Sequence, residues 1–171
     1  PYIEFTGVLT HAGKSYGCRS RESLDAMARQ ERDRSVAAAE RLREAGIPCP
    51  VISIGSTPTA LAIDDLDGVT EVRPGVYVFL DLVMTGLGVC SVDDIALSVL
   101  ASVTGFQEQK DWAIIDAGWM AMSRDRGTAD QAVDYGYGAV CDAGGTPVAD
   151  LVIGDANQEH GIVVSRGGHH R

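Results

Sequence analysis

The first half of the chain sets two short apolar runs on either side of one long, mostly polar segment. Residues 3–10 (IEFTGVLT) and 51–54 (VISI) are rich in apolar and β-branched residues, which predicts two strands. Residues 21–45 predict a helix, with Ser20 as its N-cap and Gly46 as its stop signal. The apolar positions at helical spacing are Leu24, Met27, Ala28, Ala38, Leu42 and Ala45.

The order strand, helix, strand indicates a βαβ unit. Because VISI is uniformly apolar, we expect it to be a buried strand of a parallel sheet. A right-handed crossover then brings the loops HAGKSYG (11–17) and GSTPTA (55–60) to the same side of that sheet. The run VYVFL (76–80) predicts a third buried strand.

After about residue 85 the pattern changes to short apolar runs at roughly ten-residue spacing. Gly, Asp and Pro separate these runs, which is typical of an antiparallel β domain. The first run also fits a helix. We therefore predict an α/β part over 1–84 and a β domain over 85–171. The five runs are 95–103, 111–118, 138–142, 148–154 and 161–165.

Composition narrows the classes of partner. The 171 residues are 45% hydrophobic, which is enough for a packed core, and the net charge of −10 disfavours nucleic acid and anionic membranes as partners. No apolar stretch approaches 18 residues, so we expect a cytoplasmic protein. The four cysteines lack the spacing of a zinc site or a disulfide framework, which predicts free thiols.

The two loops on the shared face offer hydroxyl groups, backbone N–H groups and few acids. That mixture suits a phosphate better than a metal or a sugar. By itself GSTPTA fits an ordinary strand-to-helix turn equally well. The chain contains no GK[ST] loop and no GxGxxG helix start, so a nucleotide-binding fold has no support.

Six segments in order resemble one family: THAGKSYG, GSTPT, TEVRPGVYVFLDL, DAGWMAMSRDRG, GYG and QEHG. The chain is similar to the D-threonine aldolase and D-serine dehydratase-like enzymes, which are related to alanine racemase. The resemblance implies a pyridoxal 5'-phosphate (PLP) enzyme with a (β/α)8 barrel followed by a β domain. Residues 1–84 would be the C-terminal part of that barrel. Residues 85–171 would be the β domain, incomplete at its C-terminus.

The resemblance also implies which residues face the cofactor. Tyr16 matches the tyrosine expected beside it, while Ser56 and Thr57 match the hydroxyl turn that holds the phosphate. The backbone N–H groups of Gly75 and Val76 would complete the phosphate cup.

Two parts of the family's machinery do not match. The family's Schiff-base lysine lies on the first barrel strand, whereas this chain has only Lys14 and Lys110, neither at a matching position. The family's divalent metal, Zn or Mn, is held by a pair downstream of the E-H-G motif, and no such pair follows here, so we predict no metal ligand in this chain. We expect another part of the barrel or a partner chain to supply both.

The histidines leave alternatives open. His11 and His160 are catalytic candidates, and each also fits a structural role. His169 and His170 fit a terminal tail.

The implied activity is a lyase that cleaves or dehydrates a D-configured β-hydroxy amino acid, acting as a homodimer. The alternatives are an amino-acid racemase of the same fold and a non-catalytic cofactor-binding protein.

Overall fold

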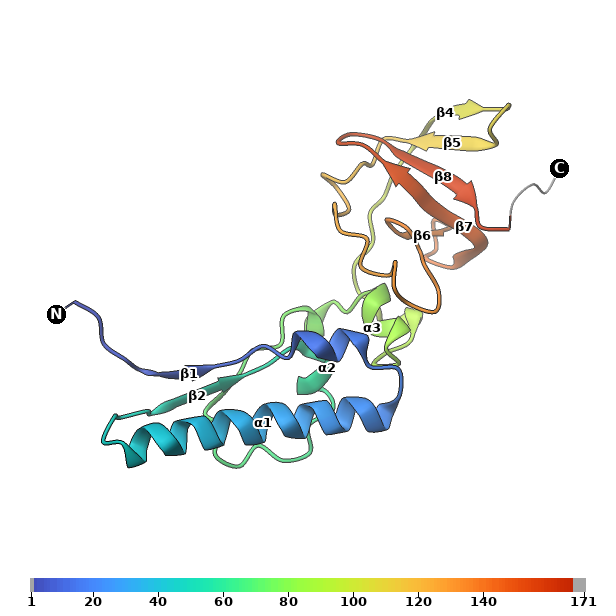
Figure 1. The fold of residues 1–171 in the computed structure, drawn as a ribbon. Helices are drawn as coiled ribbons and strands as arrows, with labels where there is room; N and C mark the ends of the chain where they lie inside the picture. The colour runs from blue at the N-terminus through green and yellow to red at the C-terminus, as the bar shows by residue number, and fades with distance from the viewer. Residues whose placement is uncertain (1, 168–171) are drawn as a thin grey trace. The chain divides into compact units, whose positions relative to one another are not determined.

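The computed structural model describes residues 2–167, which form two compact units (Figure 1). The α/β unit comprises the chain up to Leu80 together with Leu87–Asp94. The β unit comprises Asp81–Gly86 together with the chain from Ile95 onward. The boundary that we predict after residue 84 therefore falls within the short helix α3 (Leu82–Gly86), which groups with the β unit.

The α/β unit is built on three parallel strands in the order β1-β2-β3. β1 (Gly7–Leu9) pairs with β2 (Val51–Ile54), which pairs with β3 (Glu71–Val72). The predicted βαβ unit is confirmed, although β1 occupies only the last part of the predicted run 3–10.

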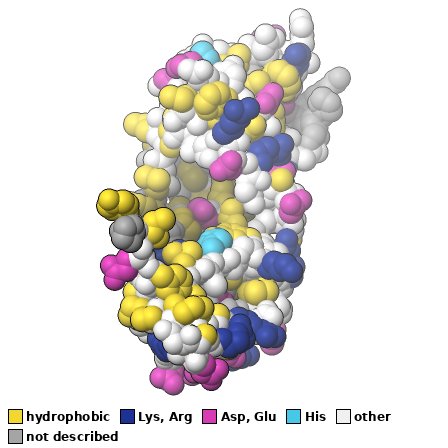
Figure 2. Space-filling view, turned by 60° about the vertical axis from the view of Figure 1, so that its left-hand side comes forward, with side chains coloured by type: hydrophobic (Ala, Val, Ile, Leu, Met, Phe, Trp, Pro, Cys, Tyr) yellow, Lys and Arg dark blue, Asp and Glu magenta, His cyan; other side chains and the backbone are white. Residues whose placement is uncertain are grey.

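Helix α1 (Arg21–Glu44) connects β1 to β2 and packs against both (Figure 1). The predicted N-cap is confirmed, because the Ser20 hydroxyl accepts a hydrogen bond from the backbone N–H of Ser23 and a capping box results. At the other end, Gly46 has a positive φ of 77°, which suits the residue that follows a helix. In Figure 2, Lys, Arg, Asp and Glu side chains gather at the lower end of the α/β unit.

The buried face of α1 differs from the predicted one. It is formed by residues that follow each other at intervals of three or four: Leu24, Ala28, Glu31, Ser35 and Ala39. Leu24 and Ala28 pack with Ala62, while Ala39 packs with Cys49 and Ile52. Between these two apolar clusters, the helix therefore buries a carboxylate and a hydroxyl.

The prediction of a strand at VYVFL is wrong. Val76–Val78 form a short 3-10 helix, η2, and the backbone N–H of Phe79 donates to the carbonyl of Val76. Tyr77, Val78 and Phe79 are exposed, so this run does not enter the sheet. A short apolar run carries no periodicity to separate a strand from a turn, and the third strand is the polar pair Glu71–Val72 instead.

The β unit contains an antiparallel sheet, as predicted, and its five strands have the order β4-β5-β8-β7-β6. Its buried core consists of Ile115, Ala117, Ile153 and Val163. The five strands are β4 (Val103–Gln107), β5 (Trp112–Ile115), β6 (Ala139–Cys141), β7 (Pro147–Ala156) and β8 (Gly161–Ser165).

The interpretation of 95–103 as one strand or helix is wrong, because residues 95–102 are irregular and β4 begins only at Val103. The backbone N–H of Ser102 donates to the Asp116 carboxylate instead of to a neighbouring strand. Leu97 and Leu100 are exposed, whereas Ala101 is half-buried and packs against the core of the β unit.

The four cysteines are free thiols, as predicted. Among residues 2–167, no helix combines the length and the low polarity that crossing a membrane requires.

Candidate functional site

The loops that follow β1 and β2 meet, as the βαβ prediction requires. The first contains the 3-10 helix η1 (Gly13–Gly17), and the second forms the short helix α2 (Thr57–Ala60). The hydroxyl oxygens of Ser15 and Ser56 lie 3.0 Å apart, and both residues are buried. HAGKSYG and GSTPTA are therefore joined by a direct hydrogen bond.

His11 also binds the second loop, through a hydrogen bond of its ring. Its Nδ1 lies 2.8 Å from the carbonyl oxygen of Gly55. Because a carbonyl oxygen only accepts hydrogen bonds, Nδ1 carries the proton, and in the neutral ring Nε2 is then an acceptor. The ring is exposed and its centroid lies 6.1 Å from that of Tyr16, so two of the predicted site residues are neighbours.

The GSTPT loop is buried to a degree that is unusual for hydroxyl residues. Ser56 and Thr57 are each 1% exposed, and Thr59 is 2% exposed. Gly55 has a φ of 144°, and a Cβ at this position would lie 2.7 Å from the backbone nitrogen of Arg73. The loop and the segment after β3 thus approach so closely that only glycine fits between them.

Thr57 is bonded to the turn that was predicted to complete the phosphate cup. Its hydroxyl oxygen accepts the backbone N–H of Val76 at 3.0 Å. Among the described residues, no hydrogen bond is made by the N–H of Gly75, which is exposed, and no acceptor is bonded to the Thr57 hydroxyl proton. These two donors, with no carboxylate bonded to either of them, fit a phosphate group.

Sequence reasoning missed Glu31, which is 7% exposed on α1. Its carboxylate accepts hydrogen bonds from the Thr10 hydroxyl, the Gly55 backbone N–H and the Thr59 hydroxyl. The available signal was its spacing, since Glu31 lies three residues after the buried Ala28 on the same helix.

Arg73 belongs to the motif TEVRPGVYVFLDL, and its side chain connects the ends of two strands. Its Nε donates to the Ser53 hydroxyl at 2.6 Å, and its Nη2 donates to the Thr10 carbonyl. The Ser53 hydroxyl in turn donates to the Glu71 carboxylate. Through these hydrogen bonds the guanidinium connects the C-terminal end of β1 with that of β2.

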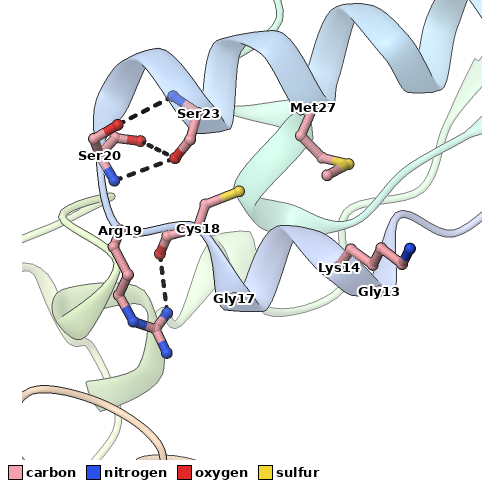
Figure 3. Close-up of a pocket in the computed structure, with 8 residues that line it drawn as sticks. All are labelled: Gly13, Lys14, Gly17, Cys18, Arg19, Ser20, Ser23 and Met27. Atoms are coloured by element: carbon pink, nitrogen blue, oxygen red, sulfur yellow. Dashed lines mark hydrogen bonds between the residues drawn. The ribbon is translucent and has the colours of Figure 1, made fainter.

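The two lysines are not bonded to these hydroxyl groups. Lys110 is exposed in the turn between β4 and β5, with Nζ 4.2 Å from the Trp112 ring centroid. Lys14 is exposed on η1 and borders an open pocket of about 820 Å³. Figure 3 shows its amine pointing away from Ser20 and Ser23, which line the opposite end of that pocket.

That pocket offers little chemistry of its own. The Ser20 and Ser23 side chains are used in the capping box of α1, and the Arg19 guanidinium donates to the carbonyls of Tyr16 and Cys18. Met27 reaches from α1 towards η1 and Cys18 (Figure 3). The candidate site is therefore the cluster around Ser56 and Thr57.

His160 lies in the β unit and makes none of these contacts. It is exposed in the turn between β7 and β8, where its backbone N–H donates to the Asn157 side chain. His169 and His170 lie outside the described residues. No group of three or more His, Cys, Asp and Glu that could hold a metal ion occurs among residues 2–167.

A lowered carboxyl pKa marks a structural turn in the β unit. The backbone N–H of Gly136 bonds to the Asp134 carboxylate and lowers its pKa, and the Thr128 hydroxyl and the Arg126 guanidinium add to this. Because Asp134 and these partners all lie within residues 126–136, the shift reflects a local structural role.

Comparison with known proteins identifies the chain's relatives. The model of the alanine racemase N-terminal domain matches residues 1–83, and that of the putative serine dehydratase domain matches residues 96–171. The D-threo-3-hydroxyaspartate dehydratase of Delftia sp. (strain HT23) is 63% identical over 162 residues. The chain belongs to the D-threonine aldolase and D-serine dehydratase-like family. This family depends on PLP, and it is the one that the sequence motifs indicated.

The fold and the lengths agree with this assignment. The solved Delftia dehydratase has a TM-score of 0.91 and 60% identity to this chain, and the match covers 99% of this chain and 45% of that one. The D-serine dehydratase of Dictyostelium discoideum is 32% identical over 130 residues, which is 74% of this chain. The chain spans 43% of the length of the first curated relative and 33% of the second. The match to the solved enzyme supports the predicted part of a barrel followed by a β domain.

Proposed function

We propose that the protein to which this chain belongs is a PLP-dependent lyase that dehydrates a D-configured β-hydroxy amino acid. The observation that carries the proposal is the 63% identity to the D-threo-3-hydroxyaspartate dehydratase over 95% of this chain. The D-serine dehydratase and the D-threonine aldolase, which are less similar to this chain, are also named after D-configured β-hydroxy amino acids.

The residues of this chain would hold the cofactor's phosphate. The hydroxyl proton of Thr57 and the N–H of Gly75 are the uncommitted donors, and the hydrogen bond from Val76 to Thr57 keeps the two segments together. When bound, PLP supplies an electron sink that weakens the bonds to the substrate's α-carbon. Holding the phosphate fixes where that electron sink lies.

Tyr16 and His11 would border the cofactor next to this phosphate seat. Their rings are neighbours, and the contact of His11 with Gly55 joins them to the loop. Since Nδ1 of His11 is the donor in that contact, Nε2 is the atom that can accept and hold a proton.

We further propose that the lysine linked to PLP and a divalent metal, Zn or Mn, are supplied by parts of the full-length protein other than these 171 residues, or by a partner subunit. A variant of the Delftia dehydratase is described as being in a metal-free form, which supports a metal in that enzyme. The proposal includes a homodimer, which light scattering of the full-length protein tests by its mass.

Product analysis tests the proposed reaction. Full-length protein loaded with PLP and metal is incubated with D-threo-3-hydroxyaspartate. Dehydration followed by hydrolysis yields oxaloacetate and ammonia, whereas retro-aldol cleavage yields glycine and glyoxylate, and racemisation yields only a stereoisomer. We expect oxaloacetate and ammonia in equal amounts. Glycine and glyoxylate, or a stereoisomer alone, would contradict dehydration.

A spectroscopic measurement tests the cofactor independently. We expect the full-length protein with PLP to absorb at about 410–430 nm, and borohydride to abolish that band. Peptide mapping should then place the reduced label on a lysine other than Lys14 and Lys110. A protein that remains colourless after incubation with PLP would support the non-catalytic alternative.

A further inference from the structure

Three hydroxyl groups and one carboxylate form a continuous buried chain behind the proposed phosphate seat. Ser15 contacts Ser56 at 3.0 Å, Ser56 contacts Thr59 at 2.9 Å, and Thr59 contacts Glu31 at 2.7 Å, all between side-chain oxygens. All four residues are at most 7% exposed. This hydrogen-bonded series of side chains runs from η1 through the GSTPT loop to α1.

The carboxylate at the end of this chain fixes the direction of every proton in it. The single hydroxyl proton of Thr59 has two acceptors, Glu31 Oε2 at 2.7 Å and the Ser56 carbonyl at 3.3 Å. The shorter bond to a charged acceptor is the stronger one, so Thr59 donates to Glu31. In its contact with Ser56, the Thr59 oxygen then has no proton to give and must accept.

The same argument fixes the next two groups. Ser56 donates its proton to Thr59, so in the contact with Ser15 the Ser56 oxygen is the acceptor. That oxygen also accepts the backbone N–H of Thr59. Ser56 therefore uses its one donor and both lone pairs inside the protein, which leaves no hydroxyl proton for a ligand.

Glu31 also holds the backbone of the loop. Its Oε1 accepts the N–H of Gly55 at 3.1 Å and the Thr10 hydroxyl at 3.2 Å. A buried carboxylate is costly unless hydrogen bonds compensate for the lost water, and here three donors from two loop segments do so. The geometry of the loop and the burial of Glu31 thus depend on each other.

We propose that Glu31 is a positioning residue for the cofactor's phosphate: it orients the hydroxyl chain Ser15–Ser56–Thr59, and this leaves Thr57 as the loop's side-chain donor to the ligand. This inference rests on the proposed function for the identity of the ligand. It changes the role of Ser56, which the sequence motif grouped with Thr57. Ser56 holds the loop, and Thr57 faces the phosphate.

The first experiment replaces the carboxylate by its amide in the full-length protein. In Glu31→Gln, the side-chain amide nitrogen faces the Thr59 hydroxyl and cannot accept its proton. Thr59 then has to donate to Ser56, which reverses the direction of the hydrogen bond between these two hydroxyl groups. We expect the dissociation constant for PLP, measured by absorbance titration, to rise about tenfold. Glu40→Gln, an exposed position on the same helix, is the matched control and should stay within twofold of the wild type.

A double-mutant cycle separates orientation from a general loss of stability. Thr59→Val removes the link between Glu31 and Ser56, and we expect it to weaken PLP binding about tenfold. Because both changes break the same chain, the double variant should also lose about tenfold and not about a hundredfold. Thr59→Ser keeps the hydroxyl and should bind within twofold of the wild type. Ala39→Gly, which opens the core of the same helix, should destabilise the protein without changing the dissociation constant.

Hydrogen exchange of the cofactor-free protein keeps the inference testable apart from the proposed function. The peptide over residues 52–60 should exchange at least several times faster in Glu31→Gln than in the wild type or in Glu40→Gln. If the wild type does not bind PLP, the proposed function fails and this measurement alone decides the role of Glu31. Wild-type exchange and affinity in Glu31→Gln, or effects that multiply in the double variant, would overturn the inference. If Glu31→Gln does not fold, wild-type affinity and exchange in Thr59→Val would overturn it.

Discussion

The α/β unit and the β unit bury different kinds of residue. Of the eight polar or charged residues buried in the described part of the chain, Thr128 alone belongs to the β unit, and the others belong to the α/β unit. The core of the β sheet is apolar instead. Burying hydroxyls and a carboxylate adds little stability, since each one only regains the hydrogen bonds that water would have made. The contrast indicates that the buried residues of the α/β unit fix the orientation of polar groups. The buried residues of the β unit, in contrast, mainly stabilise its fold.

The largest effect that we predict tests the β unit. Ile153 is 5% exposed at the centre of the sheet's core, and Ile153→Ala should lower the free energy of unfolding by about 2–5 kcal/mol. Urea unfolding of the full-length protein measures this. Val148→Ala on the same strand, at a position that is 39% exposed, is the control and should cost much less. The dissociation constant for PLP should not change in either variant, and a tenfold change in Ile153→Ala would remove the contrast between the units.

The next effect tests the α/β unit. Gly55→Ala forces a side chain into a conformation with φ of 144° and against the backbone of Arg73, so we expect a loss of about 1–3 kcal/mol in the free energy of unfolding. In contrast to Ile153→Ala, this variant should also weaken PLP binding, because Gly55 connects the loop to His11 and Glu31. Gly17→Ala, where an added Cβ meets open space, should leave both quantities near wild type. Unchanged PLP affinity in a folded Gly55→Ala protein would show that the loop does not hold the ligand.

A smaller effect is expected at Lys110. Its amine over the exposed Trp112 ring is a surface cation–π contact, so Lys110→Ala should cost at most about 0.5–1 kcal/mol in urea unfolding. Lys110→Arg preserves the contact and should cost less. Neither variant should change the visible absorbance of the PLP-loaded protein. Loss of that absorbance in Lys110→Ala would place the cofactor's lysine in the β unit and contradict the division of roles.

The smallest effect concerns the acid sensitivity of the β unit. Because the folded protein lowers the pKa of Asp134, ionisation of this group favours the folded state above the unfolded pKa of about 3.9, and the advantage is lost as the pH falls through the lower folded value. Asp134→Asn should therefore be less stable than the wild type at neutral pH, and the difference should begin to shrink near pH 4 and vanish below the lower folded pKa. Urea unfolding at several pH values checks this. A difference that stays constant down to pH 3 would show that the charge of Asp134 is not responsible.

The sequence predicted the elements whose signals are local. The cap at Ser20, the stop at Gly46 and the four short strands predicted after residue 110 follow from side chains close in the chain, and the structure confirms them. The run 76–80 was predicted wrongly because apolar character alone does not say whether a strand has a neighbour to pair with.

The candidate site was predictable only in part. The Gly and hydroxyl residues at the strand ends indicated a phosphate, and the family motifs named Thr57 and Val76, which do bond to each other. Glu31 could not be found in this way, because its partners Thr10, Gly55 and Thr59 are more than 20 residues away along the chain. A glutamate among many charged residues on a helix looks like part of the solvated face until the fold shows what lies against it.

The central claim is that the GSTPT loop and the turn at Gly75 and Val76 hold the phosphate of PLP, with Thr57 as the donor. The most direct test is the dissociation constant of the full-length protein for PLP in Thr57→Val and Thr57→Ser. We predict that Thr57→Val weakens binding about tenfold or more, because the loop loses its uncommitted hydroxyl proton, and that Thr57→Ser binds within about threefold of the wild type. Equal affinity in all three proteins would contradict the claim.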